Sequence, residues 1–230
     1  MSTDKQTEEK IFESATEIFL IKGMDGARMQ DIADHAGINK SLLHYYFRSK
    51  EKLFNAVAEA LAKKMFSRLA PIFNQEMSLE DKIKLFFDVH ISFLQNNPRL
   101  PIFVLNEMHR SPQHIKKIFA RLNIEKMLNI LAEQHKAELG DCQFPVDNLI
   151  QIITSIVSLS IFPFAAREAI ESILGKTDTR FDDYLEARKA FASEFVIGAL
   201  KNENLNKLPT ATSISKSKKG KSTERKKSKN

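Results

Sequence analysis

Apolar side chains recur every three or four residues along most of this chain, and polar side chains fill the positions between them. This period is that of amphipathic α-helices with one buried face, and no segment shows the strict alternation of a half-buried strand. The pattern therefore predicts an all-α protein of about nine helices. We expect these helices at 8–21, 29–36, 40–47, 50–70, 79–95, 100–110, 112–139, 146–173 and 181–201, with a bend at Pro163.

Turn residues and changes of composition divide the pattern into three parts. Residues 1–54 hold three short helices, and residues 55–203 hold longer helices that carry most of the phenylalanines. Residues 204–230 contain mainly Lys, Ser and Thr, with almost no large apolar side chain, so they cannot bury enough surface to become ordered. We therefore expect a small N-terminal domain, a larger helical domain and a disordered tail.

Composition restricts the class of protein further. The hydrophobic content of 43% and the charged content of 28% are those of an ordinary soluble protein. The single Cys142 has no partner for an internal disulfide, which fits the reducing cytoplasm. The most apolar stretch, 149–166, contains several polar side chains and is short for a membrane span. We expect a cytoplasmic protein with no membrane association.

The net charge of +6 is unevenly distributed. From Lys207 onward there are nine Lys and Arg residues and one acidic residue, Glu224, so the tail carries +8 and the rest of the chain −2. Overall basicity is therefore no argument that the folded part binds DNA. The tail itself fits two interpretations: an electrostatic anchor to nucleic acid, or a solubilising extension.

A helix-turn-helix pattern lies within the first 54 residues. Two short helices, 29–36 and 40–47, are joined by Gly37, which permits a positive φ, and by Asn39, which can cap the second helix. Four apolar side chains can fix the helices to each other, whereas the outer face of the second helix carries hydrogen-bond donors and rings. Such a face suggests a partner, and an α-helix fits the major groove of DNA. The inner residues are Ile32, Ala33, Ile38 and Leu43, and the outer ones Lys40, Ser41, Leu42, His44, Tyr45 and Tyr46.

Residues 30–54, QDIADHAGINKSLLHYYFRSKEKLF, resemble the DNA-binding region of the TetR family of transcriptional regulators, and YYF-x-SKE-x-LF is the most specific part. The similarity extends over roughly residues 10–57. It implies that Lys40, Ser41 and Leu42 lead a recognition helix into the groove, and that Lys50 holds a phosphate. Met29, Leu42 and His44 depart from the family pattern, so the operator sequence is not predicted. The implied DNA-binding residues are Gln30, Asn39, Lys40, Ser41, Leu42, His44, Tyr45, Tyr46 and Lys50.

Five residues in and beside this set also have other interpretations. We expect Phe47 in the core, and we expect Tyr46 to face outward more than inward, judging by helical facing. His35 is expected at the surface without contacting DNA. Lys50 and Lys52 could also be plain solvated charges, although the position of Lys50 favours a contact.

The resemblance also implies a ligand cavity in the larger domain and a homodimer formed by its last helices. A two-fold dimer would bind a pseudo-palindromic operator, and a small, largely apolar effector of unknown identity would release it. For each polar candidate a surface position or a satisfied core position remains open. Pocket candidates are Phe86, His90, Phe93, Phe103, Glu107, Phe119, Ser155 and Phe162, and dimer candidates are Ile152, Ile156, Leu159, Phe191 and Phe195.

Enzyme motifs are missing from the sequence. Glu107, His109 and Cys142 do not have the spacing of a metal site, and neither a glycine-rich phosphate loop nor a nucleophile elbow is present. We therefore expect no catalysis, no cofactor and no metal. The expected function is ligand-responsive transcriptional regulation, usually repression in this family. The alternative is a helical carrier or sensor of a lipid-like ligand that binds no operator.

Overall fold

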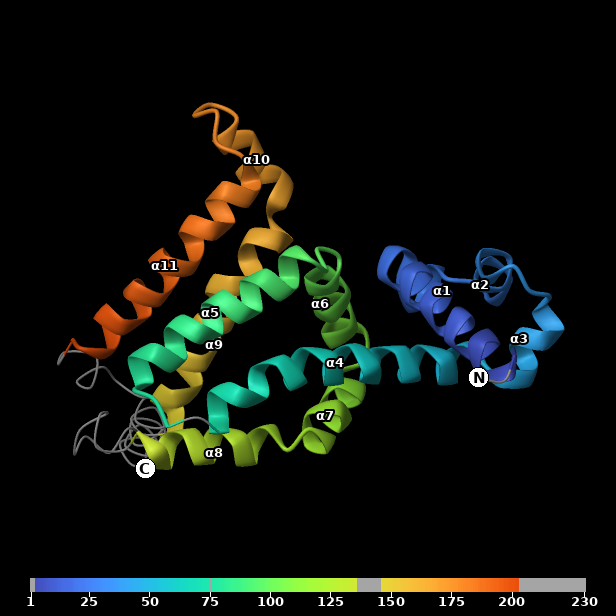
Figure 1. The fold of residues 1–230 in the computed structure, drawn as a ribbon, viewed down its shortest axis with the longest axis horizontal. Coiled ribbons are helices and arrows are strands. Elements are labelled where there is room, and N and C mark those ends of the chain that lie inside the picture. Colours follow the sequence, from blue (N-terminus) through green and yellow to red (C-terminus); the bar gives the residue numbers. More distant parts are fainter. Residues whose placement is uncertain (1–2, 75, 136–145, 203–230) are drawn as a thin grey trace, which may run out of the picture. The chain divides into compact units, whose positions relative to one another are not determined.

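The computed structural model describes residues 3–74, 76–135 and 146–202, and every regular element in these ranges is an α-helix (Figure 1). The prediction of an all-α protein is confirmed. The tail 204–230 and Cys142 lie outside the described residues. The helices are α1 (Thr3–Gly26), α2 (Met29–Ala36), α3 (Lys40–Tyr46), α4 (Lys50–Asn74), α5 (Leu79–Gln95), α6 (Leu100–Arg110), α7 (Pro112–Arg121), α8 (Ile124–Gln134), α9 (Val146–Ala165), α10 (Arg167–Leu174) and α11 (Phe181–Leu200).

The described ranges hold eleven helices where the sequence predicted about nine, because two long predicted helices are broken. The predicted helix 112–139 is interrupted at Asn123, which adopts a positive φ of 51°. The predicted helix 146–173 is interrupted at Ala166, and the segments on either side meet at 73°. The bend thus comes three residues after Pro163, which stays inside α9. Asn tolerates the left-handed region better than most residues, so the first break falls at a residue that permits it.

The chain forms two compact units. Of the described residues, the first unit combines 3–74 with 92–128, and the second combines 76–91 with 129–135 and 146–202. The domain boundary that the sequence predicted, after residue 54, lies inside the continuous helix α4.

The first unit is built around the packing of α1 on α2, α4 and α6. Ile11, Phe19, Leu43 and Leu53 are fully buried, and they lie on the apolar faces that the helical period marked. The ring of Phe54 packs edge-on against Phe19, with 4.9 Å between ring centroids. This core holds the two short helices α2 and α3 to the longer ones.

The second unit pairs α9 with α11 and joins α11 to the first part of α5 through ion pairs. Lys84 contacts Glu194 at 3.2 Å, and Lys201 contacts Glu80 at 2.7 Å. These pairs are largely exposed and therefore contribute little stability. No single helix of the described ranges is long and apolar enough to cross a membrane; only the bent pair α9–α10 taken together has that length and composition.

Candidate nucleic-acid interface

The turn between α2 and α3 depends on Gly37, which has φ 65° and ψ 36°. The amide of Gly37 donates to the carbonyl of Asp34 at 3.1 Å, and the amide of Ile38 donates to the carbonyl of Ala33 at 3.0 Å. This hydrogen-bond pattern is a Schellman motif, which requires a left-handed residue just after the helix. The sequence of the turn thus fixes the sharp reversal that places α3 across α2.

Helix α3 is held by a cap at its start and by one buried leucine. The side chain of Asn39 accepts a hydrogen bond from the amide of Leu42 at 2.7 Å, as the sequence predicted. Leu43 has no exposed surface, and it anchors the inner face of α3 in the core of the first unit. A seven-residue helix is too short to be stable alone, so this packing determines its position.

The opposite face of α3 is exposed. Lys40, Ser41, His44 and Tyr45 are all exposed, and Tyr45 keeps 77% of its surface accessible. Leu42 and Tyr46 are half-buried, and the rings of Tyr45 and Tyr46 meet edge-to-face at 5.4 Å. The structure therefore brings six of the nine predicted DNA-binding residues together on one two-turn helix, with Asn39 directly before it.

The two remaining candidates make contacts within the protein. Gln30 is exposed and donates from Nε2 to Oδ1 of Asp34 at 2.7 Å. The ammonium of Lys50 donates to the backbone carbonyl of Ala27 at 3.0 Å, so it fastens the start of α4 to the segment between α1 and α2. This bond could not be predicted from the sequence, because the two residues lie 23 positions apart.

Three residues next to the predicted contacts, Phe47, His35 and Met29, differ in their burial. Phe47, expected in the core, is half-buried and ends α3. His35 lies at the surface as expected, 3.3 Å from the carboxylate of Glu17. Met29, which stands where the family pattern has a hydroxyl residue, is buried, and Arg28 provides no side-chain cap for α2. Helix α2 therefore begins without a side-chain cap, and Met29 is buried at its first position.

The charge around α3 favours an anion. Between Gly37 and Lys52 the charged side chains are four basic ones and one acidic one. One nearby carboxylate, Asp31, is neutralised by Lys22, whose hydrogen bond lowers the pKa of Asp31. The potential near the recognition helix is therefore set mainly by Lys and Arg, which suits a phosphate backbone.

Two predicted pocket residues of the second unit, Phe86 and His90, lie together. Their rings are 5.0 Å apart, and Nδ1 of His90 is 2.9 Å from Oγ of Ser160. Because Ser160 donates to the carbonyl of Val157, Nδ1 of His90 acts as the donor in this pair. Burial lowers the pKa of His90 from 6.5 to about 4, so the ring is neutral. Ser155 and Phe162, in contrast, are exposed.

Two further pocket candidates, Phe103 and Glu107, belong to the first unit and are buried. The carboxylate of Glu107 accepts two hydrogen bonds from Arg110, each 2.8 Å, and lies 2.9 Å from Nδ1 of His114. The guanidinium of Arg110 also lies over the ring of Phe54, 5.2 Å from its centroid. Sequence reasoning missed Arg110 and His114, although the three-residue spacing of Glu107 and Arg110 is a recognisable helical pair.

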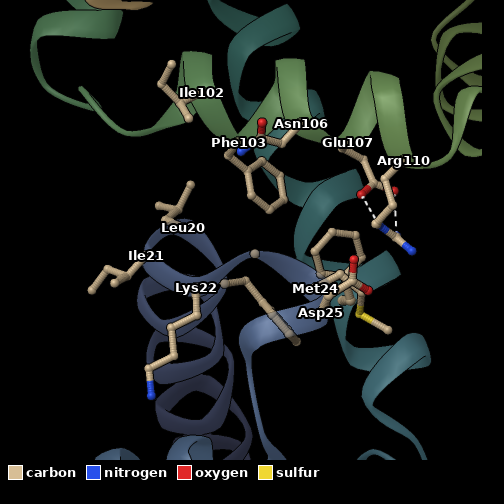
Figure 2. A pocket seen from close by; sticks show the side chains of 13 residues that line it. Leu20, Ile21, Lys22, Met24, Asp25, Ile102, Phe103, Asn106, Glu107 and Arg110 are labelled. Carbon is tan, nitrogen blue, oxygen red and sulfur yellow. Dashed lines mark hydrogen bonds and ion pairs between the residues drawn. The ribbon is translucent and has the colours of Figure 1, made fainter.

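Phe103 and Glu107 also line a cavity of about 300 Å³ within the first unit (Figure 2). Its other walls are the end of α1 and the ring of Phe54. Of the remaining pocket candidates, Phe93 is buried beside Arg68, 5.7 Å from its guanidinium, and Phe119 is exposed.

The predicted dimer residues lie on α9 and α11. Phe191 and Phe195 are 61% and 59% exposed, and their rings stack with 6.3 Å between centroids. Ile152, Ile156 and Leu159 are half-buried. The second unit thus carries a row of large apolar side chains that its own helices leave uncovered.

Comparison with known proteins identifies the helix-turn-helix region. Residues 11–57 match the family model described as bacterial regulatory proteins, tetR family. Residues 11–57 are therefore similar to the DNA-binding region of this family, as the sequence resemblance implied. The matching family and the relatives are transcriptional regulators and not enzymes. Within the described ranges, no group of His, Cys, Asp and Glu residues could hold a metal ion.

Relatives of this chain and solved structures agree with this match. YttP of Bacillus subtilis, a probable HTH-type transcriptional regulator, is 25% identical over 73% of this chain and 82% of its own length. The nucleoid occlusion factor SlmA of Vibrio cholerae is 27% identical over 52% of this chain, which spans 62% of SlmA. The crystal structure of FadR from Bacillus subtilis in complex with stearoyl-CoA superposes with a TM-score of 0.57 and 17% identity, over 84% of this chain and 97% of FadR.

Proposed function

We propose that this protein is a cytoplasmic repressor that binds a pseudo-palindromic operator as a homodimer and is released by a small, largely apolar effector. One observation carries the DNA-binding part of the proposal. Helix α3 is anchored by the buried Leu43 and the cap of Asn39, while Lys40, His44 and Tyr45 are exposed on the other side. A rigid helix with an exposed polar and aromatic face can read base edges and phosphates.

The roles within the interface follow from exposure and chemistry. Lys40 and Ser41, in the first turn of α3, would reach base edges, and His44, Tyr45 and Tyr46 would combine base and phosphate contacts. Leu42 would provide an apolar contact, for example to a thymine methyl group. The bond of Lys50 to Ala27 favours a positioning role for this lysine: it holds the start of α4, where the backbone amides can face a phosphate.

The exposed apolar side chains of the second unit support the homodimer. Phe162, Phe191 and Phe195 each keep more than half of their surface accessible, which is unfavourable in water unless a partner covers them. In a two-fold dimer these faces would bury one another. Two recognition helices related by a two-fold axis match a pseudo-palindromic operator whose half-sites lie about 34 Å, one turn of DNA, apart.

The dimer is tested by sedimentation equilibrium. Phe191→Glu places a charge in the apolar row and is expected to yield a monomer, while Gln113→Glu, which adds the same charge at an exposed position of α7, is expected to leave the dimer intact. A dimer that tolerates Phe191→Glu would contradict this interface.

Operator binding is tested with DNA from upstream of the protein's own coding sequence. We expect a mobility shift that Lys40→Ala and Tyr45→Ala each weaken by about tenfold or more, since each removes a contact worth about 1–3 kcal/mol. The matched control is Lys63→Ala, which removes an exposed lysine of α4. Lys63 lies about 20 Å along this helix from its first residue, Lys50. Equal losses in all three variants would indicate non-specific charge attraction and contradict readout by α3.

The effector proposal rests on fold likeness and on the aromatic surroundings of His90. FadR, which shares this fold, is crystallised with stearoyl-CoA. We propose that the effector of this chain likewise has a long apolar part. Stearoyl-CoA and free stearate serve as probes. A true effector lowers the affinity of the protein for DNA, and DNA lowers the affinity of the protein for the effector by the same factor.

The alternative function is a carrier or sensor of a lipid-like ligand that does not bind an operator. It is separated by the same assays. Stearate binding together with no mobility shift on any DNA at low salt would favour the carrier.

A further inference from the structure

Pro163 leaves one backbone carbonyl of α9 without its usual helical donor. Because proline has no amide hydrogen, the carbonyl of Leu159, four residues earlier, cannot accept the hydrogen bond that continues an α-helix. Pro163 is buried, and it lies inside α9 instead of at its start, where a missing donor would have no effect. The carbonyl of Leu159 therefore needs a donor from outside its own helix.

Arg188 of α11 supplies that donor. Its Nε donates to the carbonyl oxygen of Leu159 at 3.3 Å, across 29 positions of sequence. The bond thus joins α11 to α9 at the point where Pro163 interrupts the hydrogen bonding of α9. No carboxylate of the described residues pairs with Arg188, so the side chain is positioned by this carbonyl and by the ring that its guanidinium covers.

That ring belongs to Phe191, three residues further along α11. The central carbon of the Arg188 guanidinium lies 5.7 Å from the centroid of the ring, which is a cation–π contact. Phe191 stacks in turn on Phe195, and both rings keep more than half of their surface accessible. Arg188 therefore connects the interrupted part of α9 with the two aromatic rings of the proposed dimer face.

The shape of the guanidinium allows both contacts at once. It is planar, so an N–H in its plane can donate to a carbonyl while its face lies over a ring, whereas the ammonium of a lysine is a compact charge without such a face. The adjacent Lys189 points elsewhere, because its ammonium lies 3.4 Å from Asp88 of α5. The two neighbouring cations of α11 thus hold this helix to two different helices.

We propose that Arg188 is a positioning residue of the dimer face. Through the carbonyl of Leu159 that Pro163 frees, it fixes α11 on α9 and holds Phe191 in the orientation that meets the partner protomer. This inference rests on the homodimer proposed above, and it adds the pair of residues that sets the geometry of the interface within each protomer.

The test is a double-mutant cycle on the dissociation constant of the full-length dimer, measured by sedimentation equilibrium. Arg188→Met removes the donor and the charge, and Pro163→Ala restores the amide that the carbonyl of Leu159 lacks. A two-fold dimer contains the arrangement twice, so an effect of about threefold per protomer appears as about tenfold in the dissociation constant. We expect Arg188→Met to raise this constant about tenfold in the wild-type background, and about threefold or less in the Pro163→Ala background.

Two further variants separate geometry from charge. Arg188→Lys keeps the charge but not the planar group, so it should raise the dissociation constant by about threefold. Arg180→Met removes an exposed cation just before α11, 3.7 Å from Asp182, and should leave the dissociation constant unchanged. Urea unfolding of each variant shows that it is folded under the conditions of the assay, and if Arg188→Met does not fold, the cycle uses Arg188→Lys in its place.

The possible failures are distinct. A dimer that Arg188→Met or Arg188→Lys leaves as tight as the wild type, even where the free energy of unfolding falls, would overturn the positioning role. Equal losses with and without Pro163 would show that Arg188 does not act through the carbonyl of Leu159, and would overturn it as well. A wild-type chain that is monomeric throughout the concentration range would instead contradict the homodimer itself, together with the inference that rests on it.

Discussion

Two adjacent leucines in the recognition helix should differ sharply in their contribution to stability. Leu43 has no exposed surface, and Leu42 is half-buried. Replacing Leu43 by Ala removes apolar carbon worth about 2 kcal/mol of transfer free energy and leaves a cavity, so the expected loss is about 3 kcal/mol. Leu42→Ala removes the same atoms from a site that water already reaches, so the expected loss is about 1 kcal/mol. A loss of 3 kcal/mol is a large part of the stability of an ordinary domain.

The tyrosines provide the assay. The chain has three tyrosines and no tryptophan, and Tyr45 and Tyr46 both lie on α3. In a Tyr184→Phe background, urea unfolding followed by tyrosine fluorescence therefore reports on the recognition helix alone. Comparing the two Ala variants in this background gives the difference in free energy of unfolding directly.

The result that would refute the reasoning is equally specific. If Leu42→Ala costs as much as Leu43→Ala, or if Leu43→Ala costs less than about 1 kcal/mol, Leu43 does not anchor α3 in the core. The outward face of α3 would then be assigned to the wrong side of the helix. The DNA-contact roles proposed for Lys40 and Tyr45 would have to be revised with it.

Three other predictions concern the turn, the buried histidine and the tail. Gly37→Ala should lower the free energy of unfolding by about 1–2 kcal/mol, because φ is 65° there, whereas Gly198→Ala, inside α11 with open space around it, should raise it by about 0.5–1 kcal/mol; thermal melts distinguish the two signs. Burial lowers the pKa of His90 to about 4, so between pH 6.5 and 4 the unfolded chain binds the proton and the folded chain does not. The free energy of unfolding should therefore fall by about 2 kcal/mol between pH 7 and pH 5, and His90→Asn should remove this dependence in urea titrations at both pH values. Truncation after Lys207 should weaken non-specific DNA binding and flatten its salt dependence while leaving operator preference unchanged; an unaltered slope would assign the tail another role.

Sequence alone predicted the helices whose ends carry strong local signals. Met29–Ala36 ends at a glycine that must adopt a positive φ, and Leu79–Gln95 begins after Ser78, whose hydroxyl accepts from the amide of Asp81. Such caps act within one turn, so they are legible in a short window of sequence. The break at Asn123 was not predicted, because amphipathic sequence continues on both sides and Asn123 is neither Gly nor Pro. The bend predicted at Pro163 comes three residues later, at Ala166.

The candidate sites also include parts that local sequence predicts and parts that it does not. The outward face of α3 follows from local spacing, because every residue of that face lies within seven positions. Lys50 donates to the backbone carbonyl of Ala27, 23 positions away. Glu107 of α6 contacts His114 of α7, and Arg110 lies over the ring of Phe54 of α4. Each of these contacts joins groups on different elements of the fold. Periodicity tells which side of a helix is buried, but not which other helix covers it. The sequence by itself therefore determined that α3 presents a polar and aromatic face, whereas only the packing of α1, α4 and α6 decided where a buried charge and a cavity would form.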